Sequence, residues 1–391
     1  MTLAARVKRL LSRSIDGHAD VREYQPRSGY LPFLPHVTPD GVVAVQPDRS
    51  GLLEPGTPYL TAIDELPIDA WLSAVQEFVP RGTSRWVREK TVSGLVFIQE
   101  WRIHLGRATP DTVSITLSDG ERETHRTLTV TDTKPAFGVW PGPGSRAIGN
   151  VGYLRLPMMS PRAAAEIGEW LPRFRDMRGL IIDVRGNSGG SRQAFMPLLP
   201  YLVPPSLGPQ VVNLAYPRQS ASFDPAALEG RGLRPVTDAR WTSEERYVID
   251  AFLTPFHPAW TPPEGQFGAP HLMLLERGDA SSFLNMPVVV LSDPVCLSAT
   301  DVFLRLASLL PNVTLMGEGS GGSSGAPRVH RLPGSGLHVR LASMASFQPD
   351  GRLFDGHGVD VDVHVPPTPE TFLQGGHDSL LGEALAFVRG A

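Results

Sequence analysis

A short apolar run, followed by a serine and then by an amphipathic pattern, most constrains what this chain can fold into. Residues 288–291 (VVVL) are all aliphatic, and Pro287 and residues 292–294 (SDP) bound them. An apolar run of this length between chain breakers is typical of a buried parallel strand. Apolar residues then recur at helical spacing from Val302 to Leu309, so we expect Ser298 to lie where a helix begins.

A serine at a helix start has two alternative roles. As an N-cap, Ser298 accepts hydrogen bonds from the first-turn amides, and Asp301 three residues later completes an acidic capping box. As a nucleophile, it uses the same free amides and the positive end of the helix dipole to stabilise an oxyanion. Taken by itself, this stretch favours the cap, and the rest of the chain changes the balance.

Bulk composition limits the classes of function. A length of 391 residues predicts two or three domains, and a hydrophobic fraction of 41% is enough for real cores. The net charge of −4 gives no electrostatic support for binding nucleic acid or an anionic membrane. No stretch approaches the roughly 20 apolar residues of a membrane span. The single cysteine, Cys296, excludes an internal disulfide, and we expect it to be a buried, inert thiol.

The N-terminal segment predicts a helix and then a histidine turn. Residues 3–11 place leucines and a valine on one face and basic residues on the other, without the apolar core of a signal peptide. The default expectation is therefore a cytoplasmic protein, or an exported one if a leader is missing. A helix with so little to pack against also suggests a missing natural N-terminal portion. His18, directly after Asp16 and Gly17, is expected near the surface or in a cleft.

Residues 36–133 read as a small β-rich unit with one helix. The helix is predicted over residues 68–78, and residues 112–117 and 124–130 form a hairpin around the turn SDGE at 118–121. Strands around a helix fit a peptide-binding module of the PDZ type, which adds a ligand strand to a sheet edge. The alternative is a structural β-domain.

The second unit has an α/β pattern. A strand at 150–156, a helix at 161–174 and a strand at 179–184 predict a right-handed parallel crossover. The turn RGNSGG at 185–190 leaves backbone amides bare for a phosphate or an oxyanion, and we expect a helix over 192–202 after it. Residues 207–283 read as an insertion that covers the site or dimerises.

One formal motif match fails on its context. Residues 321–325 (GGSSG) fit the pattern G-x-S-x-G of a nucleophile elbow. Ala326 and Pro327, which follow, do not open a helix, so we attribute the match to chance and expect a glycine loop beside the site.

Three motifs in a fixed order carry a family resemblance. They are GLIIDVRGNSGG at 179–190, VVVL with SATD between 288 and 301, and SFQPDGRLFDGHGVDVD at 346–362. Together they resemble the tail-specific or C-terminal processing serine peptidases, the family that includes the tricorn core. The resemblance implies a ClpP/crotonase-like layered α/β core over 134–391, with the insertion at 207–283. It also implies a PDZ-like domain at 36–133, after an N-terminal segment at 1–35.

One departure from the family selects the mechanism. Many members pair the serine with a lysine in a G-K-G segment, but here residues 322–324 are GSS, so a serine–lysine pair is not available. The tricorn-like branch uses serine, histidine and an acid instead. The resemblance therefore implies Ser298 as nucleophile, His18 as general base and Asp355 as the acid that orients it.

Further residues have supporting roles in this hypothesis. The Ala299 amide, with that of Gly189 or Gly190, is expected to form the oxyanion hole. Glu318 and Ser323 are accessory candidates, and His357 is a rival participant to Asp355. The two glycines have an alternative role, which is to permit a sharp bend.

The expected function is a serine peptidase that cleaves extended or unfolded polypeptides through an acyl-enzyme. Neither a metal nor a cofactor is implied, because there is no H-E-x-x-H and the histidines are scattered. The sequence leaves open whether the chain forms a homo-oligomer. The alternatives are a catalytically inactive binding or scaffold protein with this fold, and a serine hydrolase of a non-peptide ester or amide.

Overall fold

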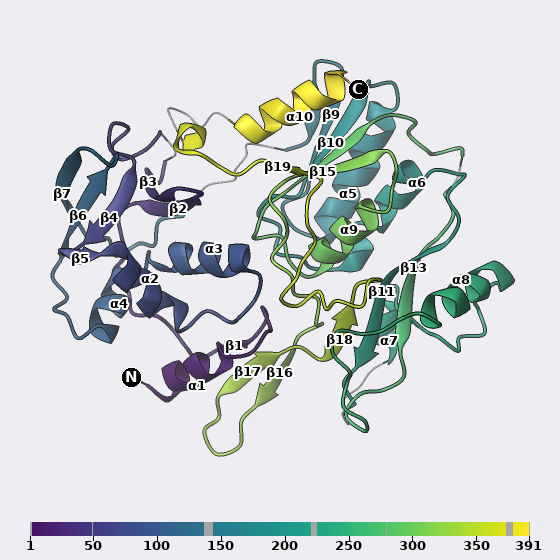
Figure 1. The fold of residues 1–391 in the computed structure, drawn as a ribbon, viewed down its shortest axis with the longest axis horizontal. Helices are drawn as coiled ribbons and strands as arrows, with labels where there is room; N and C mark the ends of the chain where they lie inside the picture. Colours follow the sequence, from purple (N-terminus) through teal and green to yellow (C-terminus); the bar gives the residue numbers. More distant parts are fainter. Residues whose placement is uncertain are drawn as a thin grey trace.

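The computed structural model describes residues 2–48, 50–136, 144–219, 225–278, 280–372 and 378–390. A smaller N-terminal unit lies beside a larger α/β core (Figure 1). In the part of the chain that the structure describes, no helix combines the length and the apolar character needed to cross a bilayer.

The N-terminal unit is built on an antiparallel sheet that confirms the predicted hairpin. Its strand order is β2 (Leu34–Thr38), β3 (Gly41–Val45), β4 (Tyr59–Ile63), β6 (Thr112–Ser118) and β7 (Glu123–Thr129), and β5 (Leu66–Pro67) pairs with β4. Strands β6 and β7 pair from Thr112 opposite Thr129 to Ser118 opposite Glu123. Strand β2 is left as an edge.

The prediction of one helix in this unit was wrong. The described part of this unit has three helices: α2 (Ile68–Gln76), α3 (Ser84–Gly94) and α4 (Ile98–His104). Helix α3 buries few residues, among them Trp86, so its apolar stripe is too narrow to stand out. The available signal was its cap, because the Thr83 hydroxyl accepts from the Trp86 amide at 3.2 Å.

The core contains a six-stranded, mostly parallel sheet. Its order is β19 (Val363–His364), β15 (Val313–Gly317), β14 (Val288–Ser292), β10 (Gly179–Asp183), β9 (Val151–Arg155) and β8 (Arg146–Ile148), and only β8 is antiparallel to its neighbour. Helix α5 (Pro161–Trp170) makes the predicted crossover between β9 and β10.

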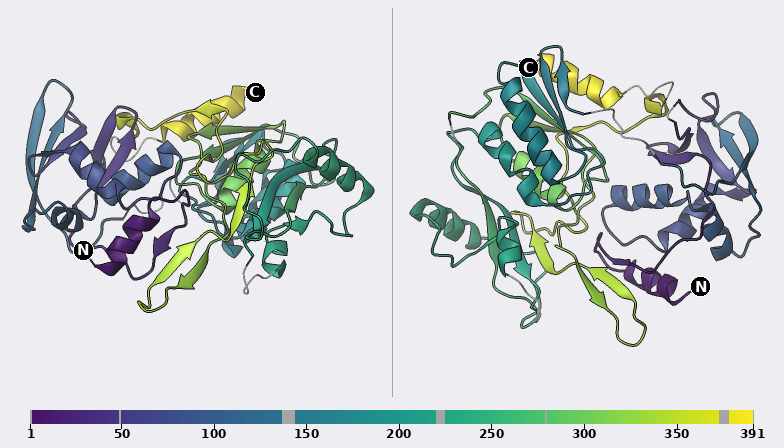
Figure 2. Two further views of the ribbon diagram at one scale, coloured as in Figure 1. Left: turned by 60° about the horizontal axis from the view of Figure 1, so that its bottom comes forward. Right: turned by 180° about the vertical axis from the view of Figure 1, so that it is seen from behind.

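Helices cover both faces of this sheet (Figures 1 and 2). Val288 and Val290 pack toward the core cluster that contains α9 (Ala299–Ala307), whereas Val289 and Leu291 pack against α10 (Ser379–Gly390). Because both faces are buried, β14 is a continuous apolar run, as predicted.

The predicted insertion, residues 207–283, builds most of a second sheet. Its order is β12 (Arg234–Pro235), β13 (His271–Leu275), β11 (Gln210–Pro217) and β18 (Met344–Phe347), with helices α7 (Pro225–Glu229) and α8 (Ser243–Leu253) beside it. Strand β18 comes from outside the insertion, so this sheet is anchored to the core chain.

The helix predicted over residues 192–202 is broken. The structure has two 3₁₀ turns, η2 (Arg192–Ala194) and η3 (Met196–Leu198), and then the single turn α6 (Leu199–Leu202). Pro197 and Pro200 lack the amide hydrogens that a continuous helix needs.

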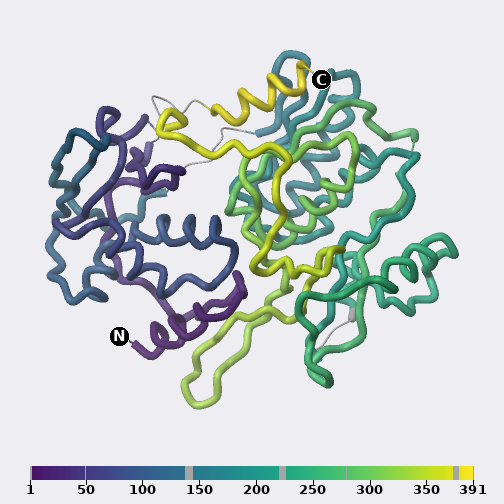
Figure 3. Tube along the Cα trace, viewed as in Figure 1, coloured from purple at the N-terminus to yellow at the C-terminus, as the bar shows by residue number. Residues whose placement is uncertain are grey.

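Strand pairing and a crossing segment of the chain join the N-terminal unit to the core. Strand β1 (Asp20–Val21) pairs with β17 (His338–Leu341), which pairs with β16 (Arg328–Arg331), a strand that the sequence did not predict. At the other side the trace leaves β19 and crosses to the N-terminal unit through η4 (Pro369–Phe372) (Figure 3). Helix α1 (Leu3–Leu11) has its predicted bounds, and residues 137–143 of the predicted linker lie outside the described residues.

Candidate active site

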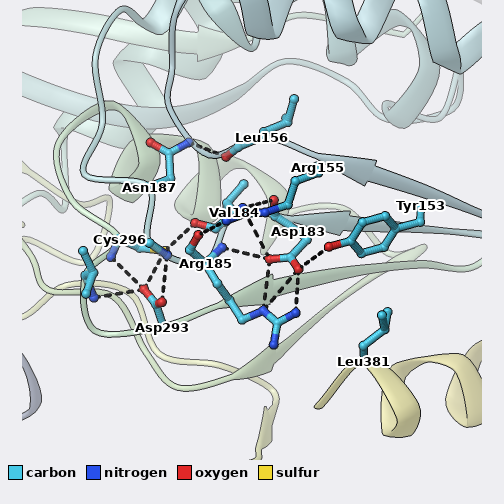
Figure 4. A network of polar contacts seen from close by, with 12 residues as sticks. Tyr153, Arg155, Leu156, Asp183, Val184, Arg185, Asn187, Asp293, Cys296 and Leu381 are labelled. Carbon is cyan, nitrogen blue, oxygen red and sulfur yellow. Dashed lines mark hydrogen bonds and ion pairs between the residues drawn. The ribbon is translucent and has the colours of Figure 1, made fainter. Parts of the chain in front are cut away.

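A buried ionic network holds the turn after β10 (Figure 4). Asp183 Oδ2 accepts from the Tyr153 hydroxyl at 2.7 Å and from Arg185 Nη2 at 2.6 Å, and Arg185 also pairs with Asp378 at 2.8 Å. Burial alone would raise the pKa of Asp183, but the guanidiniums of Arg185 and Arg155 lower it overall. Asp183 is therefore an anion whose charge fixes the start of the glycine turn.

The glycine turn packs against the segment that leads into α9. Gly186 N donates to Asp293 Oδ2 at 2.7 Å, and Leu297 N donates to Asn187 O at 3.2 Å. Gly189 has a φ of 100°, and a Cβ added there would lie 2.7 Å from Ser298 Cβ. Glycine is thus required at this position both for the backbone conformation and for the close approach.

Ser298 does not have the backbone of an ordinary N-cap. Its φ of 63° and ψ of −116° differ from the extended conformation usual at that position. A non-glycine residue held at positive φ stores about 1–3 kcal/mol of strain, a feature that clusters at functional sites. The residue is 9% exposed, and its amide donates to Asp301 Oδ2 at 2.7 Å.

Asp301 connects the Ser298 turn to the loop after β15. Oδ2 also accepts from Ser323 N at 3.0 Å, while Oδ1 accepts from the Ser320 hydroxyl at 2.5 Å and from Gly322 N at 3.1 Å. Burial raises the pKa of Asp301 to about 6, although these hydrogen bonds oppose the shift. The sequence pattern predicted a capping box for Asp301 but not this wider role.

His18, Ser323 and Asp355 form a buried chain of contacts. Ser323 Oγ lies 2.8 Å from His18 Nδ1 and donates to Asp355 Oδ1 at 2.7 Å. Because that hydroxyl proton goes to Asp355, the oxygen is left to accept from an Nδ1–H of His18. This assignment leaves His18 Nε2 without a proton. No hydrogen bond joins His18 to Ser298 within the described part of the chain.

The charges of this chain are set by burial. Burial lowers the pKa of His18 to about 3, and the guanidiniums of Arg340 and Arg231 add to the effect, so the imidazole is neutral near pH 7. Burial raises the pKa of Asp355 to about 7, and the Asp16 carboxyl adds to this shift. Asp355 therefore changes charge in the physiological range.

Asp16 brings a second carboxylate to the histidine. Asp16, His18 and Asp355 each have one potential ligand atom, and these atoms lie within 4.8 Å of one another. Asp16 Oδ1 accepts from His18 N at 2.9 Å and Oδ2 accepts from Ala342 N at 2.8 Å. These carboxylates are thus already engaged by donors of the chain itself, which favours a hydrogen-bonded framework over a metal centre.

The three amides predicted for the oxyanion hole differ in their availability. Gly189 N donates to Asn187 Oδ1 at 2.9 Å. The amides of Gly190 and Ala299 have no acceptor among the described residues. Gly189 instead lies with its Cα against Ser298, as its close contacts show.

Glu318 and His357 form no hydrogen bond with His18 among the described residues. Glu318 lines a cavity of about 620 Å³ between the N-terminal unit and the core, together with Arg85 and Glu89 of α3. Burial raises the pKa of Glu318 to about 7, and the Asp293 carboxylate adds to the shift. His357 is exposed, and its backbone oxygen accepts from Arg85 Nη2 at 3.1 Å.

Arg85 and its neighbours tie the N-terminal unit to the site loops. Arg85 Nε donates to Ser320 O at 2.9 Å, and Thr83 Oγ1 donates to Gly321 O at 3.1 Å. No sequence pattern predicts these contacts, because more than 200 residues separate the partners.

Comparisons with known proteins place the chain in a family. Residues 150–365 match the model of "Peptidase family S41", which covers more than half of the chain, and the chain belongs to that family. This confirms the family predicted from the three motifs. No curated protein matches the sequence.

Solved structures support the fold. Mature CPAF aligns with a TM-score of 0.65 at 15% identity, over 96% of this chain and 85% of that one. CPAF complexed with lactacystin gives 0.65 at 14% identity, over 98% and 88%. A putative peptidase from Parabacteroides merdae is 21% identical, with a TM-score of 0.45. That match covers 62% of this chain and 63% of the other chain, which is less than two thirds of its length. The two CPAF matches show a mixed α/β fold consistent with an S41 peptidase core.

Proposed function

We propose that this protein is a serine peptidase of the Ser-His-acid type, with Ser298 as nucleophile. The observation that carries the proposal is the strained backbone of Ser298, beside the free amides of Ala299 and Gly190. A simple N-cap has no need of a positive φ, whereas a nucleophile that must face both a base and an oxyanion hole does.

The proposed chemistry needs a contact between His18 and Ser298, and no hydrogen bond of the described structure provides it. His18 Nε2 takes the proton of the Ser298 hydroxyl and later returns it to the leaving amine. The Ser323 hydroxyl accepts from His18 Nδ1 and donates to Asp355. Through this hydroxyl, the Asp355 carboxylate orients the imidazole and stabilises the imidazolium. The Ala299 and Gly190 amides stabilise the tetrahedral oxyanion.

Substrate binding has to complete this arrangement. Ser298 N and Ser323 N both donate to Asp301 Oδ2, so the nucleophile and the partner of His18 already belong to one framework. Catalytic hydrogen bonds are often long in the free enzyme and shorten when substrate binds. A small closing movement of the loop that holds Ser323 is therefore part of the proposal.

The N-terminal unit is proposed to be PDZ-like and to bind extended peptide. Its strand β2 is a sheet edge, and the 620 Å³ cavity is lined by His36 and Val37 of β2 and by Ser84 of α3. An edge strand beside a helix suits the addition of a ligand strand. Unfolded or C-terminal segments are the substrates that such a layout serves.

A fluorophosphonate probe tests the nucleophile and its base. Wild type, Ser298→Ala and His18→Ala are labelled side by side, with circular dichroism and intact mass as controls for folding and stoichiometry. We expect one label per chain in wild type, none in Ser298→Ala, and a loss of at least about 100-fold in labelling rate in His18→Ala.

Two results would sink the proposal. One is a folded wild type that takes no label, which would make this a binding protein with a peptidase fold. The other is equal labelling of Ser298→Ala, which would move the nucleophile elsewhere. Cleavage of an unfolded protein substrate, against a simple ester, then separates a peptidase from an esterase.

A further inference from the structure

Arg192 is a buried arginine without a carboxylate partner in the described chain. It is 1% exposed and its Nε atom is buried with no hydrogen-bond partner. Its terminal nitrogens contact Ser324 Oγ at 3.2 Å, Arg231 O at 3.4 Å and Met273 Sδ at 3.7 Å. All three partners are neutral groups, so no described residue compensates the positive charge.

Other buried arginines of this protein are paired. Arg102 contacts both carboxylate oxygens of Asp64, at 2.8 and 3.0 Å, and Arg185 pairs with Asp183 at 2.6 Å. An uncompensated buried charge is strongly unfavourable, and such charges are normally paired. Arg192 is thus an exception to a rule that the same chain obeys elsewhere.

A second cation strengthens the local positive field. Arg231 is half-buried and forms no ion pair within the described residues. Burial lowers the pKa of Arg192 to about 9, and the charge of Arg231 adds to that effect. Burial also lowers the pKa of Arg231 itself. An anion placed between the two guanidiniums would replace their repulsion with two attractions.

This pair borders the candidate active site. Arg192 comes two residues after Gly190, whose amide is a proposed oxyanion donor. Its partner Ser324 follows Ser323 directly, and Ser324 N donates to Asp355 Oδ2 at 3.3 Å. The charge of Arg231 also acts on His18. Arg192 therefore contacts the loop that holds Ser323, the partner of His18.

We propose that Arg192 and Arg231 form a carboxylate-binding subsite, so that the preferred substrate is a polypeptide with a carboxylate next to the scissile bond. The carboxylate belongs either to an acidic side chain or to a free C-terminus, and the planar guanidinium suits either one. This inference rests on the proposed peptidase function. Because Arg231 is half-buried whereas Arg192 is buried, the carboxylate enters the subsite past Arg231.

Matched peptides test the subsite. One set of synthetic peptides carries Glu or Gln at each position flanking the cleavage site, and a second set ends in a free acid or an amide. The readout is the ratio of kcat/KM for the two members of a pair, in wild type and in Arg192→Met. We expect a ratio of at least about 30 in wild type, and a ratio below about three in Arg192→Met.

Binding and stability give readings that do not depend on catalysis. Titration of Ser298→Ala with the same pairs, followed by calorimetry, should show tighter binding of the acid member. Arg192→Met should unfold at a higher temperature than wild type, because an unpaired buried charge is gone. The matched control, Arg102→Met, should unfold at a lower temperature, because the carboxylate of Asp64 is left without its ion-pair partner.

The outcomes separate this inference from the proposed function. No labelling of Ser298 would defeat the peptidase proposal but leave the binding titration to decide on the subsite. Labelling and cleavage without any preference for an acid would overturn the subsite alone. An unchanged preference in Arg192→Met, or a lower unfolding temperature of that variant, would also overturn it.

Discussion

Removing the hydroxyl of Ser323 should disable the protein without unfolding it. This hydroxyl is fully buried and is the link between His18 Nδ1, at 2.8 Å, and Asp355 Oδ1, at 2.7 Å. In Ser323→Ala the imidazole loses the acceptor that fixes its tautomer, and Asp355 loses a donor. The imidazolium formed during catalysis would then have no connection to the carboxylate.

The expected magnitudes follow from these two lost contacts. A buried polar group left without its partner costs about 1–3 kcal/mol, so the free energy of unfolding should fall by about that amount. A general base that is wrongly oriented, or held in the wrong tautomer, loses about 100- to 10,000-fold in rate. The effect on rate is thus far larger than a modest loss of stability explains.

The assay compares Ser323→Ala with a matched control, Ser320→Ala. The Ser320 hydroxyl is also fully buried, and it donates to Asp301 Oδ1 at 2.5 Å and accepts from Val359 N at 2.9 Å. It has no contact with His18. Fluorophosphonate labelling and peptide cleavage are measured as functions of pH, with thermal unfolding alongside.

Two results would refute the bridging role of Ser323. If folded Ser323→Ala reacts within about threefold of wild type, the hydroxyl does not transmit the effect of Asp355. If Ser320→Ala loses as much activity as Ser323→Ala, with the same pH profile, the effect is one of packing alone.

Two further predictions concern the glycine turn and the dependence on pH. Gly189→Ala should abolish labelling of Ser298, because the added Cβ would lie 2.7 Å from Ser298 Cβ; a labelled variant would contradict this. Thermal unfolding should show lower stability at pH 8 than at pH 5.5. The pKa of Asp355, about 7, is raised in the folded protein, which therefore binds more protons than the unfolded chain between pH 3.8 and 7 and loses stability as pH rises. Burial raises the pKa of three other carboxyls to between about 6 and 7 in the same direction, those of Asp301, Glu89 and Glu318. His18 opposes them only below pH 6.5, because its pKa is lowered. Asp355→Asn should flatten the decline, and a stability that rises toward pH 8 would contradict the assignment.

Local patterns predicted many elements of the fold. Strand β14 and helix α9 were predicted from one apolar run and one helical stripe, and α5 from Ser160 and Pro161 at its start. These patterns are predictive because a strand buried on both faces needs consecutive apolar residues, and a helix buried on one face needs apolar residues at helical spacing.

The predictions were wrong where the apolar pattern is weak or where prolines interrupt a helix. Helix α3 buries so little that its stripe was overlooked, and the helix predicted over 192–202 ignored Pro197 and Pro200. The match at residues 321–325 was set aside as chance, and the structure gives its serine, Ser323, a contact with His18 rather than a position on a nucleophile elbow.

The sequence by itself determined the family, the α/β pattern and the residue types available for chemistry, because these depend on neighbours in the chain. Only the tertiary structure decided which of them meet. His18 and Ser323 are 305 residues apart in sequence, and Ser323 and Asp355 are 32 apart. Burial and the pairing of β1 with β17 bring that chain of contacts together. The lack of a counterion for Arg192 among the described residues is likewise invisible in sequence, since any acidic residue could have been its partner before the chain folds.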